Sequence, residues 1–468
     1  MTSAADTARP TRTIAILATA TLAFSLQQTM ILPALPAFQE RYGISPSASA
    51  WLLTAFLLSS AVATPLLGRL GDMHGKARML LVSLAAFATG SLVAAVASSF
   101  ALVLVGRTVQ GAGAAILPLS IGIVRDELPR ERVAVAIGTL SSMLGIGGGA
   151  ALVLAGVLID HAGIPWLFWS GFLVTIVAAL LAWRYVPESP VRSPARVDLG
   201  GAVLLSAGLV AMLLGLTEGN RWGWTSTGVL GLFALAAAAL VGWVVWERRA
   251  PAPLVDLAML RRREVWTTNV VAAGIGAAMF GSFVLIPQFA QTPASAGYGF
   301  GDSVAAAGLV LLPSAVVMLV AGPVAGRMGG RSGARLPLCI GCVAAAVSFV
   351  WFATFHDAPW QLYVGSAFLG LGLGLGLSAM ANVVVHAVPQ RQTGIATAVN
   401  MIARSVGGAV GAQAAAAILT GSATAGSLPT ESGYSAAFLV SAGAALLAWA
   451  GAVVIPRHGR GRARPLPA

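Results

Sequence analysis

Long apolar runs alternate with short polar connections along the whole chain. A membrane-spanning helix needs about 20 mostly apolar residues, and by that criterion the pattern predicts fourteen spans. The first run has about 25 residues, too many for the ~7–15-residue core of a secretory signal, so it is predicted to be a span. The first seven predicted spans are Thr13–Ala37, Ala48–Leu67, Met79–Ser98, Ala101–Val124, Val133–Leu158, Ile164–Trp183 and Leu199–Leu216. The other seven are Thr227–Trp246, Thr267–Phe289, Val304–Gly326, Leu336–Phe355, Gln361–Val388, Gly394–Thr420 and Ala436–Ile455.

Basic residues fall at alternate ends of these spans. With a cytoplasmic N-terminus, only Arg41 and Arg221 lie outside the cell, and Arg107 and Arg404 lie within spans. Every other Lys and Arg then falls on the cytoplasmic side, where membrane proteins carry an excess of both. The pattern predicts a multi-pass protein of the cell membrane with both termini in the cytoplasm.

The composition narrows the function classes. Only 9% of the 468 residues are charged and 57% are hydrophobic, whereas soluble domains carry roughly 25% charged residues. The net charge of +12 is spread between apolar runs rather than gathered in a stripe, which argues against nucleic-acid binding. Two cysteines cannot build a four-ligand zinc site, so no metal or other cofactor is expected. An ATP-driven pump is disfavoured because no phosphate-binding loop of the GxxxxGK[ST] type occurs. A membrane enzyme is disfavoured because no nucleophile–base pair occurs at midplane depth.

A segment near the second span recurs in the second half of the chain. Residues 63–77 share their Pro, Gly and Gly-Arg spacing with residues 321–335. The repeat predicts two six-helix bundles, residues 1–184 and 267–456, separated by residues 185–266 with two inserted helices and followed by a basic cytoplasmic tail, residues 457–468. Two related halves with a site between them are typical of transporters.

The segment Gly68-Arg69-Leu-Gly-Asp72-Met-His-Gly75-Lys76-Ala-Arg78 resembles the signature loop between helices 2 and 3 of the major facilitator superfamily. Across nearly its whole length the chain is similar to the fourteen-helix drug:proton antiporter branch of that family. The resemblance implies that Gly68, Arg69, Asp72, Gly75, Lys76 and Arg78 form a gating loop whose charge network opens and closes as the halves rock. The alternative is a positive loop that only fixes topology.

Two arginines within spans are candidates for substrate handling, since an ionisable residue at membrane depth is a functional hypothesis by default. Arg107-Thr-Val-Gln110 is similar to the family's second motif, although pairing of Arg107 with backbone carbonyls is the alternative. Gln27 stands where the family pattern usually carries an Asp, and we expect it to meet Arg107 in the outer half of a cavity. The predicted cavity residues are Phe24, Gln27, Gln28, Arg107, Gln110, Asn400 and Arg404.

Glycines cluster in the fifth and thirteenth predicted spans. Gly145, Gly148 and Gly149 occupy the span where the family carries a Gly-Pro motif, but Ala151-Leu152 replaces its Gly-Pro pair. In the thirteenth span, Gly407, Gly408 and Gly411 fall on one helical face. Small residues let helices approach closely in a membrane, so both groups are predicted to pack against neighbouring helices.

These patterns predict a monomeric secondary transporter that exports drugs, antibiotics or other small amphipathic molecules by alternating access. The resemblance implies exchange for protons. No acidic residue falls near the midplane of the predicted spans, and Glu218 is placed in an external loop, so the expected proton carrier is Asp126 or Glu127, or the substrate itself. A facilitator or importer of an anionic solute and a non-transporting sensor or assembly protein remain alternatives.

Overall fold

The computed structural model describes residues 4–191, 198–423 and 428–456, and all regular elements in these ranges are helices. The first half contains α1 (Ala4–Thr29), α2 (Ile31–Tyr42), α3 (Pro46–His74), α4 (Lys76–Ala95), α5 (Phe100–Gln110), η1 (Gly111–Ala115), α6 (Ile116–Glu127), α7 (Arg130–Ala162) and α8 (Pro165–Tyr185). The middle contains α9 (Leu199–Trp222), α10 (Thr227–Glu247) and α11 (Leu257–Leu260). The second half contains α12 (Arg263–Gln291), η2 (Ala294–Ala296), α13 (Val304–Leu309), α14 (Leu312–Ser332), α15 (Arg335–Thr354), α16 (Pro359–Ala387), η3 (Gln390–Gln392), α17 (Thr393–Ser422) and α18 (Glu431–Val454).

The predicted membrane architecture is confirmed. Within the described ranges, 13 helical segments are long and apolar enough to span a membrane, and α1 with α2 forms one further, bent span. The basic tail, residues 457–468, which the sequence predicts to be cytoplasmic, lies outside the described residues.

Three spans are interrupted one turn before a proline. The first bends by 48° between α1 and α2, the fourth tightens into η1, and the tenth breaks between α13 and α14. Pro33, Pro118 and Pro313 each lie four residues after a residue in or beside the interrupted turn, namely Thr29, Ala114 and Leu309. A proline has no N–H to bond the carbonyl four residues earlier and crowds it sterically, so the regular helix is lost there.

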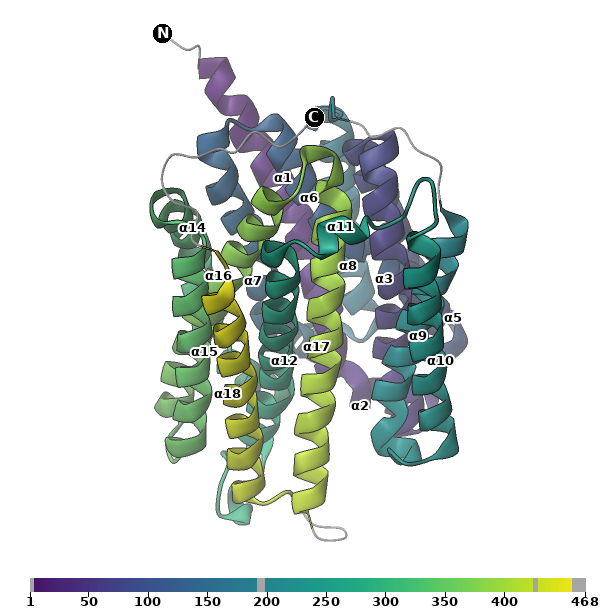
Figure 1. Cartoon of the computed structure of the whole chain (residues 1–468). Helices are drawn as coiled ribbons and strands as arrows, with labels where there is room; N and C mark the ends of the chain where they lie inside the picture. Colours follow the sequence, from purple (N-terminus) through teal and green to yellow (C-terminus); the bar gives the residue numbers. More distant parts are fainter. Residues whose placement is uncertain (1–3, 192–197, 424–427, 457–468) are drawn as a thin grey trace.

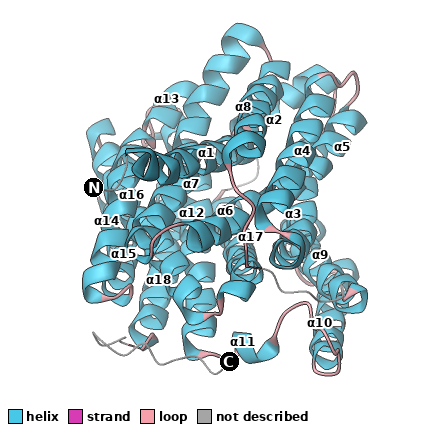
Figure 2. Ribbon diagram, turned by 90° about the horizontal axis from the view of Figure 1, so that it is seen from above, coloured by secondary structure: helices cyan, strands magenta, loops and turns pink. Residues whose placement is uncertain are grey.

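The helices form two bundles with a separate hairpin (Figure 1). Helices α1–α8 pack with one another, as do α12–α18, and the bundles meet where α7 contacts α13 and α14 and where α3 contacts α17. The hairpin α9–α10 stands at the edge of the molecule beside α3 in the view from above (Figure 2). Through α9 it contacts both α3 and α17, one helix from each bundle.

Apolar side chains cover the outer surface of the helices. Val241 of α10 is 64% exposed and Leu180 of α8 is 58% exposed. Exposed apolar area on this scale is a liability in water, but it is what a lipid-facing surface requires. Both α1 and α18 have their terminal ends toward the upper end of the molecule in Figure 1. The distribution of Lys and Arg predicts that this end faces the cytoplasm, and we call it the cytoplasmic end below.

The topology can be tested at the two ends of α12, since Arg261 precedes this span and Ser295 follows it. Both side chains are exposed. In a background carrying Cys339→Ala and Cys342→Ala, we expect Ser295→Cys to react with an impermeant thiol reagent added to intact cells. Arg261→Cys should react only after permeabilisation, because the flanking arginines hold that end in the cytoplasm. Labelling of both positions in intact cells would contradict the predicted orientation.

Candidate functional site

The predicted gating loop is almost entirely helical. Helix α3 continues through Gly68 and Asp72 to His74, and α4 begins at Lys76, so Gly75 alone connects them. Gly75 has φ 118°, which side chains rarely adopt. A Cβ there would lie 2.5 Å from the Glu188 carboxylate carbon. The expectation of a loop is therefore corrected to a sharp one-residue junction, which only glycine fits.

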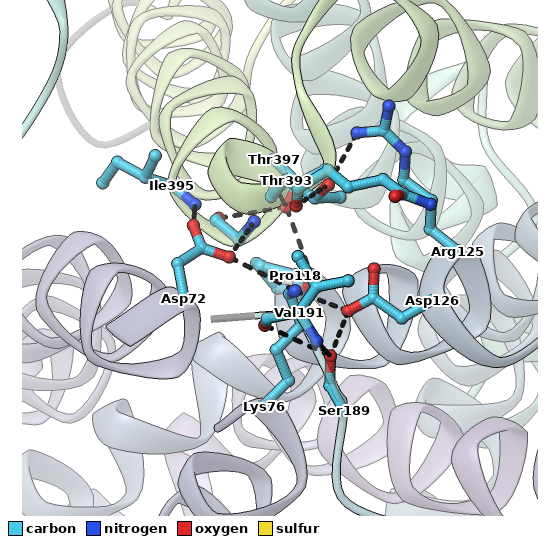
Figure 3. Close-up of polar contacts among 12 residues, drawn as sticks. Asp72, Lys76, Pro118, Arg125, Asp126, Ser189, Val191, Thr393, Ile395 and Thr397 are labelled. Atoms are coloured by element: carbon cyan, nitrogen blue, oxygen red, sulfur yellow. Dashed lines mark hydrogen bonds and ion pairs between the residues drawn. The ribbon is translucent and has the colours of Figure 1, made fainter. Parts of the chain in front are cut away.

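Lys76 lies between two carboxylates in the protein interior (Figure 3). Its Nζ is 2.6 Å from Oδ2 of Asp126 and 3.6 Å from Oδ1 of Asp72, and all three side chains are 0% exposed. The Ser189 hydroxyl also donates to Asp126. Gly122 makes room for the lysine, because a Cβ there would lie 2.6 Å from Lys76 Cδ. We call Asp72, Lys76 and Asp126 the buried charge cluster.

Asp72 joins the two halves of the protein. Its Oδ1 accepts a hydrogen bond from the Gly394 N–H at 3.1 Å, and its Oδ2 accepts one from the Ile395 N–H at 3.0 Å. These groups are in the first turn of α17, where backbone N–H groups have no helical partner and a negative charge is favoured. A carboxylate on the first bundle thus caps a helix of the second.

Further contacts close the same end (Figure 3). Arg125 of α6 donates to the Val388 carbonyl at 2.7 Å and to Thr393 Oγ1 at 2.6 Å. Asn382 of α16 donates to the Ala134 carbonyl of α7 at 3.2 Å. Each bond crosses between the bundles, so the cytoplasmic end is closed in this conformation.

The other members of the predicted gating group lie around this closure. Gly68 packs directly on α17, since a Cβ on it would lie 3.0 Å from the Gly394 carbonyl oxygen. Arg69 is half-buried. Arg78 is 3.7 Å from Glu188 in an ion pair whose arginine side chain is 67% exposed. Exposed pairs contribute little to stability, so the buried charge cluster is the stronger electrostatic element.

A cavity of about 420 Å³ lies between the two bundles and the hairpin. Its lining includes Gln28, Thr29 and Leu32 from α1 and α2; Ser47, Ala50, Leu53, Thr54, Phe56 and Leu57 from α3; and Thr217, Glu218 and Arg221 from α9. The second half supplies Phe280, Phe283 and Val284 from α12 and Ser405, Gly408, Ala409, Ala412 and Gln413 from α17. Aromatic and aliphatic walls with a few polar groups suit a small amphipathic ligand. We call this space the main cavity.

Arg107 does not line the main cavity. Its side chain is fully buried, and its guanidinium carbon lies 4.3 Å from the centre of the Phe56 ring, which does line the cavity. Arg107 donates to the Leu52 carbonyl at 3.1 Å and to Gln110 Oε1 at 2.8 Å. Bonding to a backbone carbonyl, the alternative drawn from the sequence, therefore describes this residue in the closed conformation.

Gln27, Gln110 and Phe24 also lie behind the cavity wall. Arg107 Nη1 reaches the Gln27 carbonyl at 3.5 Å, so the two residues do meet, but inside the first bundle. The Gln27 amide donates to the Leu167 carbonyl, and Gln110 donates to Ser91 Oγ at 2.7 Å. Phe24 is fully buried against Phe56 and Phe87. Of the predicted set, Gln28 lines the main cavity, whereas Gln27, Arg107 and Gln110 do not in this conformation. Phe24 lines a small space of about 20 Å³ that shares Gln28, Phe56 and Leu57 with the main cavity.

Asn400 and Arg404 line a separate small space of about 30 Å³ among α6, α7, α16 and α17. Asn400 donates to Asn269 Oδ1 at 3.0 Å. Arg404 is 6% exposed, and the next residue, Ser405, faces the main cavity instead. Both residues therefore line a space between the two bundles that is separate from the main cavity.

The glycines of the two clusters lie at close helix approaches. Those of α7 face the second half: a Cβ on Gly145 would overlap Met318, one on Gly148 would lie 2.7 Å from Phe283, and one on Gly149 3.2 Å from Ala315. Those of α17 face α12 in the same half. A Cβ on Gly407 would lie 2.0 Å from the Ala273 carbonyl oxygen, and a Cβ on Gly411 would lie 2.4 Å from the Ala277 carbonyl oxygen. A Cβ on Gly408 would lie 2.5 Å from the Phe280 ring.

The expected proton-carrying residues and Glu218 are placed as follows. Asp126 belongs to the buried charge cluster, and Glu127 is half-buried at the end of α6. Glu218 is not in an external loop, as the sequence suggested, because α9 continues to Trp222. It lines the main cavity. The signal for this longer helix was the spacing of Glu218 and Arg221, which suits an i,i+3 helical pair.

Two helical bundles with a cavity between them, joined at one end by contacts across their interface, are an arrangement typical of membrane transporters. The sequence matches the Major Facilitator Superfamily over residues 17–412 and 298–468. The chain belongs to this family.

Relatives of the chain include several resistance proteins. The tetracenomycin C resistance and export protein of Streptomyces glaucescens is 29% identical over 408 residues, which cover 86% of this chain and 74% of that protein. The multidrug resistance protein Stp of Mycobacterium tuberculosis is 27% identical over 389 residues, which cover 82% of this chain and 71% of that protein. The multidrug transporter protein MdtP of Bacillus subtilis is 24% identical over 411 residues, which cover 87% of this chain and 74% of that protein.

Among solved structures, the human organic anion transporter MFSD10 superposes with a TM-score of 0.69 at 18% sequence identity. The superposition covers 95% of this chain and 99% of that one. At this identity the likeness shows the fold alone.

The hydrogen bonds of Asp72 can be tested with Asp72→Asn, which removes the charge and one acceptor oxygen. A hydrogen bond to a charged group contributes about 1.5–3 kcal/mol, so we expect the closed-to-open ratio at the cytoplasmic end to fall by about ten-fold or more. Transport turnover should slow while the KM for substrate changes little, as measured by initial rates in everted vesicles. Asp357→Asn, at an exposed carboxylate, is the control. Unchanged turnover with a raised KM would contradict the assignment.

Proposed function

We propose that this protein exports small amphipathic molecules of the drug or antibiotic type across the cell membrane by alternating access. The observation that carries the proposal is the main cavity, which is walled by Phe56, Phe280 and Phe283 with scattered hydroxyl and amide groups. Such a surface accepts apolar bodies of different shapes and offers each a few hydrogen bonds. The resistance and export proteins among its relatives support this substrate class.

The main cavity favours this function over uptake of an anionic solute. Arg107 and Arg404 are the basic residues predicted within spans, where they could attract an anion, and neither lines the cavity. The basic side chain that does line it, Arg221, is paired with Glu218 at 3.0 Å. A non-transporting sensor needs no closure between halves, whereas the contacts of Asp72 and Arg125 form one. The geometry therefore supports transport of neutral or cationic amphiphiles.

The proposal is tested by a susceptibility panel with and without overexpression, followed by uptake into everted vesicles of each drug to which tolerance rises. We expect tolerance to rise for more than one amphipathic drug. Ala412→Trp, which fills the main cavity, should abolish the gain, whereas Thr420→Trp at an exposed site of the same helix should retain it. No gain in tolerance together with no flux after reconstitution would favour the sensor alternative.

We further propose that export is exchanged for protons and that Asp126 carries the proton. Its carboxylate is buried, and its Oδ1 has no hydrogen-bond partner among the described residues. Protonation would release Lys76 to Asp72 alone, which couples the proton to the same charges that cap α17. The cluster lies at the cytoplasmic closure, so a proton there would be exchanged when that end opens.

Coupling is tested by Asp126→Asn combined with Glu127→Gln. Lys76 keeps Asp72 as a partner, so the fold should persist. We expect uphill export driven by a pH gradient in everted vesicles to fall by about ten-fold or more, while substrate counterflow, which needs no net proton movement, continues. A single Glu131→Gln change at an exposed carboxylate of the same end is the control. Uphill export with an unchanged pH profile would rule out this carrier.

A further inference from the structure

One wall of the main cavity comes from outside the two bundles. Helix α9 of the inserted hairpin packs on α3 and α17 and contributes Thr217, Glu218 and Arg221 to the lining. The Asn220 amide fixes α9 to α17 by donating to Gln413 Oε1 at 2.7 Å and to the Gln413 carbonyl at 3.2 Å. Gln413 also lines the cavity. The hairpin is therefore part of the binding chamber as well as a connection between the halves.

Glu218 is the acidic side chain of this lining. It is 8% exposed, and its Oε2 accepts a hydrogen bond from Arg221 Nη1 at 3.0 Å, while the Arg221 side chain is 51% exposed. The two partners thus differ in their surroundings. Arginine at a half-exposed position is solvated and flexible, so its ion pair is worth little. The buried carboxylate, in contrast, is costly to leave without a positive partner while it is charged. Glu218 can exchange Arg221 for another cation.

The other walls of the main cavity also suit a cationic ligand. Phe56, Phe280 and Phe283 line the cavity, and the faces of aromatic rings attract organic cations, most strongly away from water. Arg107 lies on the far side of the Phe56 ring and is separated from the cavity by it. A carboxylate together with aromatic walls recognises an amphipathic cation better than a neutral or anionic molecule.

We propose that Glu218 is a specificity-determining residue, which binds the cationic group of amphipathic substrates in place of Arg221. This inference rests on the proposed function and adds the substrate class, namely lipophilic organic cations. Glu218 accepts the N–H or polarised C–H groups of the cation, the aromatic walls cover its apolar body, and Arg221 turns outward to water. The inserted hairpin thereby contributes selectivity that neither bundle supplies.

The proposal is tested by equilibrium binding of ethidium, an aromatic cation, to the purified full-length protein in detergent, with neutral chloramphenicol as the comparison ligand. We expect Glu218→Gln to raise the Kd for ethidium by about ten-fold or more, since a hydrogen bond to a charged group is lost. Arg221→Gln should lower the Kd for ethidium, because it removes the competing cation. In both variants the Kd for chloramphenicol, which carries no positive charge, should change less than the Kd for ethidium.

Opposite effects of the two variants distinguish recognition from a structural role, because loss of a structural ion pair would impair both ligands in both variants. Glu431→Gln is the matched control, since it breaks the 2.9 Å pair with His356 elsewhere in the chain. Equal ethidium affinity in wild type and Glu218→Gln, or no ethidium binding by wild type, would overturn the proposal. Export is measured separately in everted vesicles: a protein that binds ethidium through Glu218 but exports neither compound would contradict the proposed function alone.

Discussion

The buried ammonium of Lys76 is the constraint on which the cytoplasmic end depends. An ion removed from water costs several kcal/mol unless it is paired, and loss of one partner of a buried pair costs about 3–5 kcal/mol. Lys76 satisfies this requirement with Asp126 and Asp72, which are 2.6 Å and 3.6 Å away. It also places a positive charge beside Asp72, whose carboxylate accepts the hydrogen bonds that cap α17. Gly122 leaves the space that the Lys76 side chain needs.

The spans and their breaks follow from local sequence. Apolar length predicts each span, and a proline four residues after each interrupted turn explains why three spans are not straight. The rotation of each helix about its own axis in the bundle is harder to predict from the sequence. The spacing of Arg107 and Gln110 correctly places them on one face, and they bond at 2.8 Å. Periodicity shows that residues share a face, but it does not show whether that face meets a cavity or another helix, because both positions favour the same small and polar residues.

The position of Glu218 shows how an error in a helix end changes a functional prediction. The apolar run of the seventh span ends at Leu216, whereas the helix ends at Trp222. The apolar run stops at the first charged residue, but the helix can continue because Glu218 and Arg221 form an ion pair and Asn220 bonds to Gln413 of α17. The packing of α9 on α17 decides the end of this helix, and a single sequence contains no direct record of that contact.

The two copies of the internal repeat share glycines at equivalent positions, but they do not share their charged residues. Gly68 and Gly326 occupy equivalent places and both lie against a helix of the other half, but Gly330 and Ala334 stand where the first half has Asp72 and Lys76. The α7–α14 contact is accordingly made by Gly138, Gly322 and a hydrogen bond from Ser142 to the Met318 carbonyl at 2.8 Å. Separation of α7 from α14 would lose chiefly packing and neutral hydrogen bonds, whereas separation of α3 from α17 would expose an uncapped helix and a charged carboxylate. Of these two contacts, only the one between α3 and α17 contains a buried charged side chain, and it lies on the side of the molecule where the inserted hairpin packs.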